Sequence, residues 1–201
     1  MIKLGVLISG SGTNLQALID AIADGSLDAC IELVVSSRAD AYGLKRAEAA
    51  GISSLAFSKE DYSDPLAADE RISKAMQNAG VDYVVMAGYM RMVREPLLSA
   101  FPHRIVNLHP ALLPSFVGAH AIDDAFDYGV KVTGITIHFA NEDYDKGPII
   151  AQQAIVVGEE DTLESLEEKI HDVEHALYPQ VLQWISEGRV SVDDSGKVQV
   201  R

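Results

Sequence analysis

Short apolar runs alternate with helical segments through the first half of this 201-residue chain, and this alternation restricts the fold more than any other feature. Strands that alternate with helices form βαβ units with right-handed crossovers, and these units build a mostly parallel sheet. We therefore predict an α/β fold with an open, twisted, Rossmann-like sheet and helices on both faces. The expected strands are Ile2–Ser9, Ile31–Val35, Ser53–Phe57, Val81–Ala87 and Ile105–Leu108.

Three segments between these runs carry helix signals. Apolar residues recur at helical spacing over Asn14–Ala23, and the segments Ala41–Ala50 and Pro65–Ala79 are each followed by a glycine. Asp40 is expected to cap the helix that starts at Ala41. Ligands of such sheets bind beyond the carboxyl ends of the strands, so the loops that follow the strands are where chemistry is expected.

The second half of the chain changes character. Val132–Phe139 and Ile149–Val157 are rich in β-formers, and the polar segment between them favours an antiparallel hairpin. Two short β segments are expected within residues 190–201. Because the sequence contains no repeat, no low-complexity stretch and no linker, we expect residues 1–201 to form a single domain.

A long helix is predicted after the hairpin. Asp161 followed by Glu164 favours a capping box at its start. Pro179 is expected to kink or break it, because proline cannot donate the backbone hydrogen bond of a helix interior.

The amino-acid composition limits the classes of partner that the chain is expected to bind. The chain has 16 Lys and Arg against 30 Asp and Glu, a formal net charge of −14, and this balance argues against the basic surface of a nucleic-acid-binding protein. A single cysteine, Cys30, excludes an internal disulfide framework. No apolar run has the length of a membrane span and the N-terminus has no signal-peptide layout. We therefore expect a cytoplasmic protein that binds small molecules, with neither nucleic acid nor membrane as a partner.

The first strand runs into the sequence Ser-Gly-Ser-Gly-Thr-Asn at residues 9–14. Glycines let a backbone approach an anion, and the free N–H groups of a helix start point at it. A dinucleotide fingerprint requires a third glycine where this chain has Leu15, so a terminal phosphate suits the loop better. Arg38, after the second strand, keeps an NADP-binding module or oxidoreductase open as an alternative. The side chains of Ser11, Thr13 and Asn14 add further donors.

Asn107 and His109 end a buried strand, and their spacing of two residues places them on the same side of it. An Asn amide can donate to a developing oxyanion, and a His can shuttle a proton near neutral pH. Asp145, in the hairpin loop, is a candidate to orient or charge His109. His138, within a strand, is interpreted as a satisfied, partly buried group.

A metal site is not predicted. His171 and His175 have the helical spacing i and i+4, which suits metal chelation. However, no third ligand is fixed beside them by local spacing.

Five groups of motif residues follow one another along the chain. They are Ser9–Leu15; Ala87-Gly88-Tyr89-Met90-Arg91; Asn107-Leu108-His109-Pro110 with Leu112-Leu113-Pro114; Asp145-Lys146-Gly147-Pro148; and Glu174-His175 with Tyr178-Pro179. This combination resembles the folate-dependent formyltransferase family, and within it the phosphoribosylglycinamide formyltransferases. The resemblance covers nearly the whole chain.

The resemblance implies a reaction and roles for named residues. A formyl group passes from 10-formyltetrahydrofolate, a cosubstrate, to the amine of glycinamide ribonucleotide in purine biosynthesis, by direct attack through a tetrahedral intermediate and without a metal. The implied catalytic residues are Asn107, His109 and Asp145. The implied phosphate- and ribose-binding residues are Ser11, Gly12, Thr13, Asn14, His171, Asp172, Val173 and Glu174. The implied folate-binding residues are Met90, Arg91, Met92, Val93, Asn107, Asn141, Glu142, Asp143, Tyr144 and Asp145.

The same resemblance leaves alternatives within the family. A formyltetrahydrofolate hydrolase shares the three catalytic residues, but such enzymes usually carry an extra N-terminal domain, whereas the first strand here starts at Ile2. A methionyl-tRNA formyltransferase needs a further domain and a cationic surface. A homodimer is compatible with the resemblance.

Three positions depart from the family pattern. Pro65 stands where an arginine commonly meets the folate tail, and Arg71 or Lys59 are candidates to replace it. Val117 stands where a proline is expected, which removes a restraint on φ. The segment 121–124 is more acidic than expected. These departures are expected to affect folate affinity or loop order rather than the class of reaction.

Overall fold

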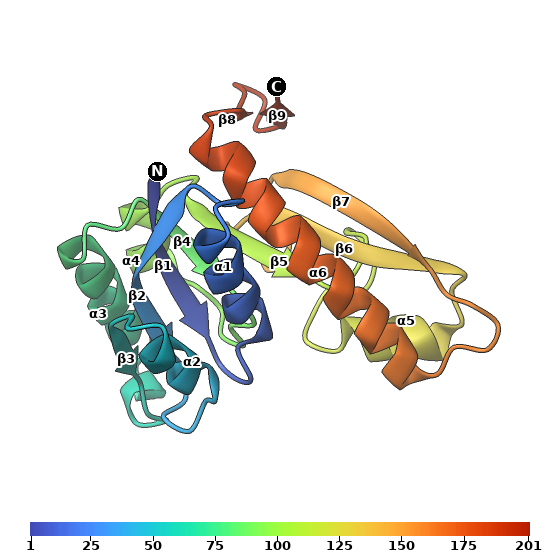
Figure 1. The fold of residues 1–201 in the computed structure, drawn as a ribbon, viewed down its shortest axis with the longest axis horizontal. Coiled ribbons are helices and arrows are strands. Elements are labelled where there is room, and N and C mark those ends of the chain that lie inside the picture. The colour runs from blue at the N-terminus through green and yellow to red at the C-terminus, as the bar shows by residue number, and fades with distance from the viewer.

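The computed structural model describes all 201 residues and is built on a seven-stranded sheet (Figure 1). Its order is β3-β2-β1-β4-β5-β6-β7; the first five strands pair in parallel, and β6 and β7 pair antiparallel. The predicted open, mostly parallel sheet with a C-terminal hairpin is thus confirmed. The strands are β1 (Ile2–Ile8), β2 (Ala29–Ser36), β3 (Ser54–Ala56), β4 (Tyr83–Met86), β5 (Ile105–His109), β6 (Val132–Phe139) and β7 (Ile149–Val156).

Helices cover both faces of the sheet, and each face has its own apolar core. One core is built under α1, α2, α5 and α6, and the other under α3 and α4. Side chains of β1 alternate between them: Leu4, Val6 and Ile8 enter the first core and Leu7 enters the second, as period-two geometry requires. The helices are α1 (Thr13–Ala23), α2 (Gly43–Ala49), α3 (Pro65–Asn78), α4 (Glu95–Ala100), α5 (Ala121–Tyr128) and α6 (Leu163–Ser186).

The strand order determines at which edge of the sheet a ligand can bind. The chain winds outward from β1 to β2 and β3, then returns to β4 beside β1 and continues to β5. At such a reversal the loops after neighbouring strands separate and leave a crevice. The carboxyl ends of β1, β4 and β5 therefore border one space, and the predicted motifs lie there.

The starts of two helices differ from the prediction. Asp40 does not cap α2, which begins at Gly43; its carboxylate instead pairs with Arg38 at 2.8 Å. The capping box of α6 is one residue later than predicted, because Thr162 and Ser165 exchange the two bonds. In both cases several polar residues compete for one cap, and sequence alone does not rank them.

The predicted break at Pro179 is wrong, because α6 continues through it to Ser186. Pro179 is buried, and the neighbouring Tyr178 is fully buried and donates its hydroxyl to the carbonyl oxygens of Met86 and Val106. These contacts fasten the helix to β4 and β5. Tertiary packing therefore outweighs the hydrogen bond that proline cannot make.

Two helices, α4 and α5, were not predicted from the sequence. Both are short, at 6 and 8 residues. The apolar residues Ala121, Ile122, Ala125 and Phe126 of α5 nevertheless lie at helical spacing, a signal that could have found this helix. The predicted final pair of β segments is confirmed as β8 (Val190–Val192) and β9 (Val198–Val200), which pair antiparallel. None of the helices combines the length and apolarity that a membrane span needs.

Candidate active site

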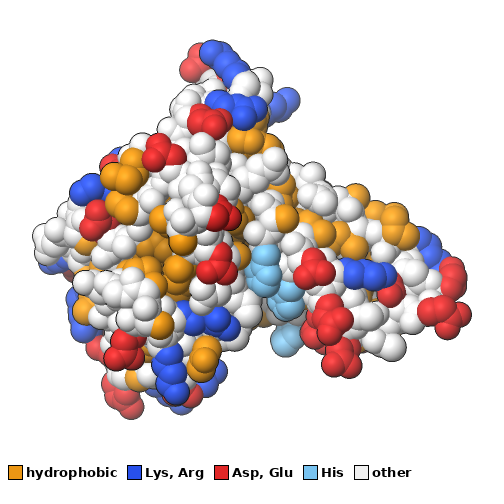
Figure 2. Space-filling model, viewed as in Figure 1, with side chains coloured by type: hydrophobic (Ala, Val, Ile, Leu, Met, Phe, Trp, Pro, Cys, Tyr) orange, Lys and Arg blue, Asp and Glu red, His pale blue; other side chains and the backbone are white.

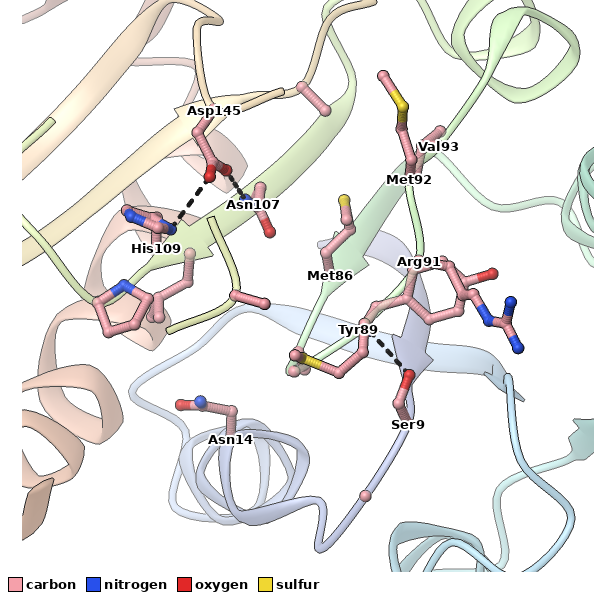
Figure 3. Close-up of a pocket in the computed structure, with 18 of the residues that line it drawn as sticks. Ser9, Asn14, Met86, Tyr89, Arg91, Met92, Val93, Asn107, His109 and Asp145 are labelled. Carbon is pink, nitrogen blue, oxygen red and sulfur yellow. Dashed lines mark hydrogen bonds and ion pairs between the residues drawn. The ribbon is translucent and has the colours of Figure 1, made fainter. Parts of the chain in front are cut away.

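A cavity of about 440 Å³ opens at the carboxyl ends of β1, β4 and β5. Seven segments that are distant in sequence line it: the loop after β1, Arg38 after β2, the segment after β4, the end of β5, residues 118–122 at the start of α5, the end of β6 with the β6–β7 loop, and α6. Figure 3 shows Asn14 on one side, the cluster of Asn107, His109 and Asp145 on another, and Met92 with Val93 on a third. The cavity thus borders the glycine-rich loop, the Asn107–His109 pair, Asp145 and Glu174, whereas Tyr178 and Pro179 lie outside it.

The backbone of the loop after β1 passes very close to the backbone at the start of α2. Gly12 has φ of +72°, and a Cβ on it would lie 2.6 Å from the Cα of Gly43. Only glycine combines this conformation with this contact. The start of α1 carries no side-chain cap, so its first N–H groups are directed at the cavity without a partner in the chain. This arrangement suits an anion.

Opposite this loop, α6 supplies a carboxylate. Glu174 is 4% exposed; its Oε2 accepts from Asn14 Nδ2 at 3.0 Å and lies 3.1 Å from His171 Nδ1. The hydrogen bond to Glu174 raises the pKa of His171, with burial as a smaller opposing effect. Asn14 Oδ1 is buried without a partner. This side of the cavity therefore combines a carboxylate, a half-exposed imidazole and an unused amide oxygen (Figure 2 shows histidine side chains in the hollow beside α6).

Asn107, His109 and Asp145 are in mutual reach at the other side. His109 Nδ1 lies 3.4 Å from Asp145 Oδ2, and Asn107 Nδ2 lies 3.5 Å from Asp145 Oδ1. The side chains of His109 and Asp145 are 5% and 3% exposed, so water screens their interaction little. The predicted juxtaposition of Asp145 with His109 is present in the structure.

Both ring nitrogens of His109 face hydrogen-bond acceptors. Its Nε2 lies 2.8 Å from the carbonyl oxygen of Phe116, and its Nδ1 faces the carboxylate of Asp145. A carbonyl and a carboxylate only accept hydrogen bonds, so these two contacts fix the orientation of the ring.

Asp145 is held in its ionised form. Burial alone raises the pKa of its carboxyl, but a hydrogen bond from His138, the charge of His109 and the backbone N–H of Gly118 together outweigh burial, so the pKa is lowered. The Gly118 N–H donates to Oδ2 at 3.2 Å. Asp145 itself has φ of +54°, a conformation that Asp and Asn tolerate better than most residues.

His138 belongs to this cluster, although the sequence analysis gave it no role. It is 2% exposed, and its Nε2 lies 3.1 Å from Asn107 Nδ2 and 3.8 Å from Asp145 Oδ1. Its Nδ1 lies 3.0 Å from the carbonyl oxygen of Phe139. The missing signal was the pairing of β5 with β6, which sets Asn107 directly opposite His138.

The Asn107 amide is turned toward its neighbours. Its nitrogen faces His138 and Asp145, and its oxygen points to the open side of the cavity (Figure 3). To donate to a group in the cavity, the amide must rotate about χ2 by half a turn and exchange these two atoms.

The remaining wall is largely apolar. Met90 and Met92 are 62% and 38% exposed beside the cavity, whereas Val93 is buried. Tyr144, 44% exposed, faces the same space from the β6–β7 loop. Methionine and tyrosine surfaces of this kind suit a flat aromatic ligand.

Most of the predicted site residues line the cavity, and three do not. Asp172 and Glu142 are exposed away from it, and Val173 packs against the core under α6. On α6, a residue facing the cavity recurs every three to four positions, so His171 and Glu174 reach it while the two between them do not. The predicted residues that line the cavity are Ser11, Gly12, Thr13, Asn14, Met90, Arg91, Met92, Val93, Asn107, His109, Asn141, Asp143, Tyr144, Asp145, His171 and Glu174.

The departures from the family pattern lie around the cavity. Pro65 occupies the first turn of α3 behind the cap of Asp64, and neither Arg71 nor Lys59 lines the cavity. Arg71 pairs with Asp61 and stacks on Phe57 instead. Val117 is 44% exposed in the loop that bonds His109 and Asp145. No group of three or more His, Cys, Asp or Glu side chains is arranged to hold a metal ion.

The chain is similar to known proteins over most of its length. Residues 2–182 match the family described as Formyl transferase. The phosphoribosylglycinamide formyltransferase of Haemophilus influenzae is 40% identical over 97% of this chain and 92% of that protein. The protein of the same name from Bacillus subtilis is 42% identical over 91% and 94%. The crystal structure of glycinamide ribonucleotide transformylase 1 from Symbiobacterium toebii has a TM-score of 0.95 and 46% identity over 100% of this chain and 94% of that one.

Proposed function

This chain belongs to the formyl transferase family, and from that premise we propose that it transfers the formyl group of 10-formyltetrahydrofolate to the amine of glycinamide ribonucleotide. One observation carries the proposal. A single cavity holds an anion-binding helix start on one side and an Asn, a His and an Asp on the other. A phosphorylated acceptor and a formyl donor can therefore meet in it.

The acceptor is bound by the loop after β1 and by α6. The phosphate lies against the N–H groups at the start of α1, with Ser11, Gly12, Thr13 and Asn14 around it. Glu174 accepts from the ribose hydroxyls, and His171, whose pKa is raised, supplies a positive charge nearby. These contacts supply local attraction for a dianion in a protein whose net charge is −14.

The formyl donor is bound by the apolar wall. Met90, Arg91, Met92 and Val93 lie on one side of its pterin, and Asn141, Asp143 and Tyr144 on the other. This arrangement directs the formyl carbon toward His109 and the bound amine toward the formyl carbon. Holding both reactants in one cavity removes much of the entropic barrier to their reaction.

The reaction is a direct attack of the amine on the formyl carbon. The C–N bond forms as the carbonyl π electrons move to oxygen. The resulting oxyanion accepts from the rotated amide of Asn107 and from protonated His109, whose Nε2 must first leave the carbonyl oxygen of Phe116. Asp145 stabilises the imidazolium. Collapse of the tetrahedral intermediate breaks the bond to the folate nitrogen, and the proton lost by the amine is relayed to that leaving nitrogen.

We further propose that residues 1–201 act as one formyltransferase domain in the cytoplasm, and that two copies associate as a homodimer. Light scattering across a concentration series tests the dimer.

The function is tested with purified protein and 10-formyltetrahydrofolate, or its dideaza analogue, with and without glycinamide ribonucleotide. Absorbance follows release of the deformylated folate. Release only in the presence of the acceptor establishes the transferase. Release without the acceptor identifies a hydrolase, and no release in either condition contradicts both activities.

A further inference from the structure

Residues 88–93, which carry the side chains proposed to bind the folate and are here called the folate wall, form no helix or strand. β4 ends at Met86 and α4 begins at Glu95, and residues 88–93 between them make no backbone–backbone hydrogen bond. Yet this segment places the Met90 and Met92 side chains at the cavity. Its own side chains Tyr89 and Val93 are buried in the core under α3 and α4, and the hydroxyls of Tyr89 and Tyr62 are hydrogen-bonded at 2.8 Å. Side chains from elsewhere bind its backbone as well.

Two polar side chains hold the ends of this segment. Ser9 Oγ, buried at the end of β1, accepts from the backbone N–H of Met90 at 2.8 Å (a dashed line in Figure 3). Asp69 Oδ2, on α3, accepts from the backbone N–H of Arg94 at 2.6 Å. The folate wall lies between these two hydrogen bonds.

Asp69 is an unusual residue for its position. It is 2% exposed on the face of α3 that packs against the core, beside Ile72 and Met76. Burial raises the pKa of its carboxyl to about 6, and the N–H and the charge of Arg94 offset that rise only in part. A buried carboxyl without a close cation destabilises a fold, so its presence calls for a compensating role.

That role is not chemical, because Asp69 does not line the cavity. Its hydrogen bond to Arg94 joins two segments 25 residues apart, directly beyond the last folate-contacting residue. We propose that Asp69 is a positioning residue for the formyl donor: by holding the N–H of Arg94, it sets the folate wall in the geometry that binds the pterin. This inference rests on the proposed formyl transfer.

The test compares three variants. Asp69→Ala removes the acceptor, Asp69→Asn keeps an acceptor oxygen without the charge, and Ser73→Ala changes a buried residue one turn along the same helix. We expect Asp69→Ala to raise KM for the formyl donor about tenfold, with KM for the acceptor within about twofold of its original value. Asp69→Asn and Ser73→Ala are expected to stay within about twofold for both substrates.

Three outcomes would overturn the inference. KM for the formyl donor could be unchanged in Asp69→Ala, it could rise equally in Asp69→Asn, or Asp69→Ala could raise KM for both substrates equally. If Asp69→Ala does not fold, Asp69→Ser takes its place, since its hydroxyl is too short to reach Arg94.

A second readout separates this inference from the reaction. Hydrogen exchange of the Arg94 amide should accelerate in Asp69→Ala and stay slow in Asp69→Asn and Ser73→Ala. If the unchanged protein transfers no formyl group, the proposed function fails while this exchange pattern still supports the positioning of the wall. Equal exchange in all three variants contradicts the inference whatever the activity.

Discussion

His109 illustrates how a site is set by single residues. Two acceptors, the Phe116 carbonyl and the Asp145 carboxylate, lie against its two nitrogens and orient the buried ring. Removing the imidazole would leave both acceptors without this partner, which destabilises a buried site.

Replacing either member of this pair is expected to stop turnover without unfolding the protein. His109→Ala removes the donor and should lower kcat by about 10²–10⁴-fold. Asp145→Asn keeps the shape and tolerates φ of +54°, but removes the charge that stabilises the imidazolium, and should lower kcat by at least about 10²-fold. Circular dichroism and thermal unfolding serve as controls for the fold. Activity within threefold of normal in both variants would exclude these residues from catalysis.

The buried carboxyl of Asp69 predicts a pH dependence of stability. Its pKa is about 6 in the folded protein and about 4 in the unfolded chain, so the folded state binds more protons between these values and stability falls as pH rises through them. Burial raises the pKa values of its neighbours Tyr62 and Tyr89, so these hydroxyls do not titrate in this range.

Asp69→Asn should remove this dependence. From pH 4 to pH 7, the free energy of unfolding of the original protein should fall by about 2–3 kcal/mol relative to that of the variant. Urea unfolding of both proteins at the two pH values measures the difference. A constant difference would mean that the carboxyl titrates normally.

At the scale of elements, the junction of β1 with α1 couples stability to acceptor binding. The turn passes so close to α2 that Gly12 and Gly43 are almost in backbone contact, and Arg46 of α2 donates to the carbonyl oxygen of Ser11 at 2.9 Å. The phosphate loop is therefore shaped by a neighbouring helix as well as by its own glycines.

Gly12→Ala tests this coupling. Its Cβ would meet the Cα of Gly43 at 2.6 Å in a left-handed conformation, so we expect a loss of roughly 2 kcal/mol or more in stability and a raised KM for the acceptor. Gly10→Ala is the matched control, because a Cβ there meets nothing within 4 Å. Urea unfolding and kinetics of both variants give the comparison. Equal effects at the two glycines would refute the contact as the cause.

For the whole molecule, the cavity and the C-terminal tail are separate. All residues that line the cavity lie between Ser9 and Glu174, whereas β8 and β9 place Val190, Val192 and Val198 at the edge of the core under α6. The tail therefore contributes to stability and not to the site.

Ending the chain at Gly188 should keep kcat and both KM values within about twofold, since no substrate contact is removed. Loss of the partly buried valines should lower Tm by roughly 2–8 °C, equivalent to about 1–2 kcal/mol. Calorimetry and steady-state kinetics measure both effects. A tenfold loss of activity in a folded, truncated protein would show that the tail acts on the cavity.

The amino-acid sequence by itself determined the parallel sheet, the C-terminal hairpin and the edge where the motifs gather, because strand runs, glycine-bounded helices and short motifs are local patterns. It also paired Asn107 with His109, since alternation along one strand fixes which side chains share a side. The fit of these motifs to one family then gave each residue an expected role.

Only the tertiary structure decided the contacts between distant segments. It set His138 against Asn107 through the β5–β6 register, Glu174 against Asn14 across 160 residues, and Asp69 against Arg94. It also carried α6 through Pro179, and turned Asp172 and Val173 away from the cavity. Such contacts depend on register and packing, which are decided by the sum of many weak interactions over the whole core and leave no local pattern in the sequence.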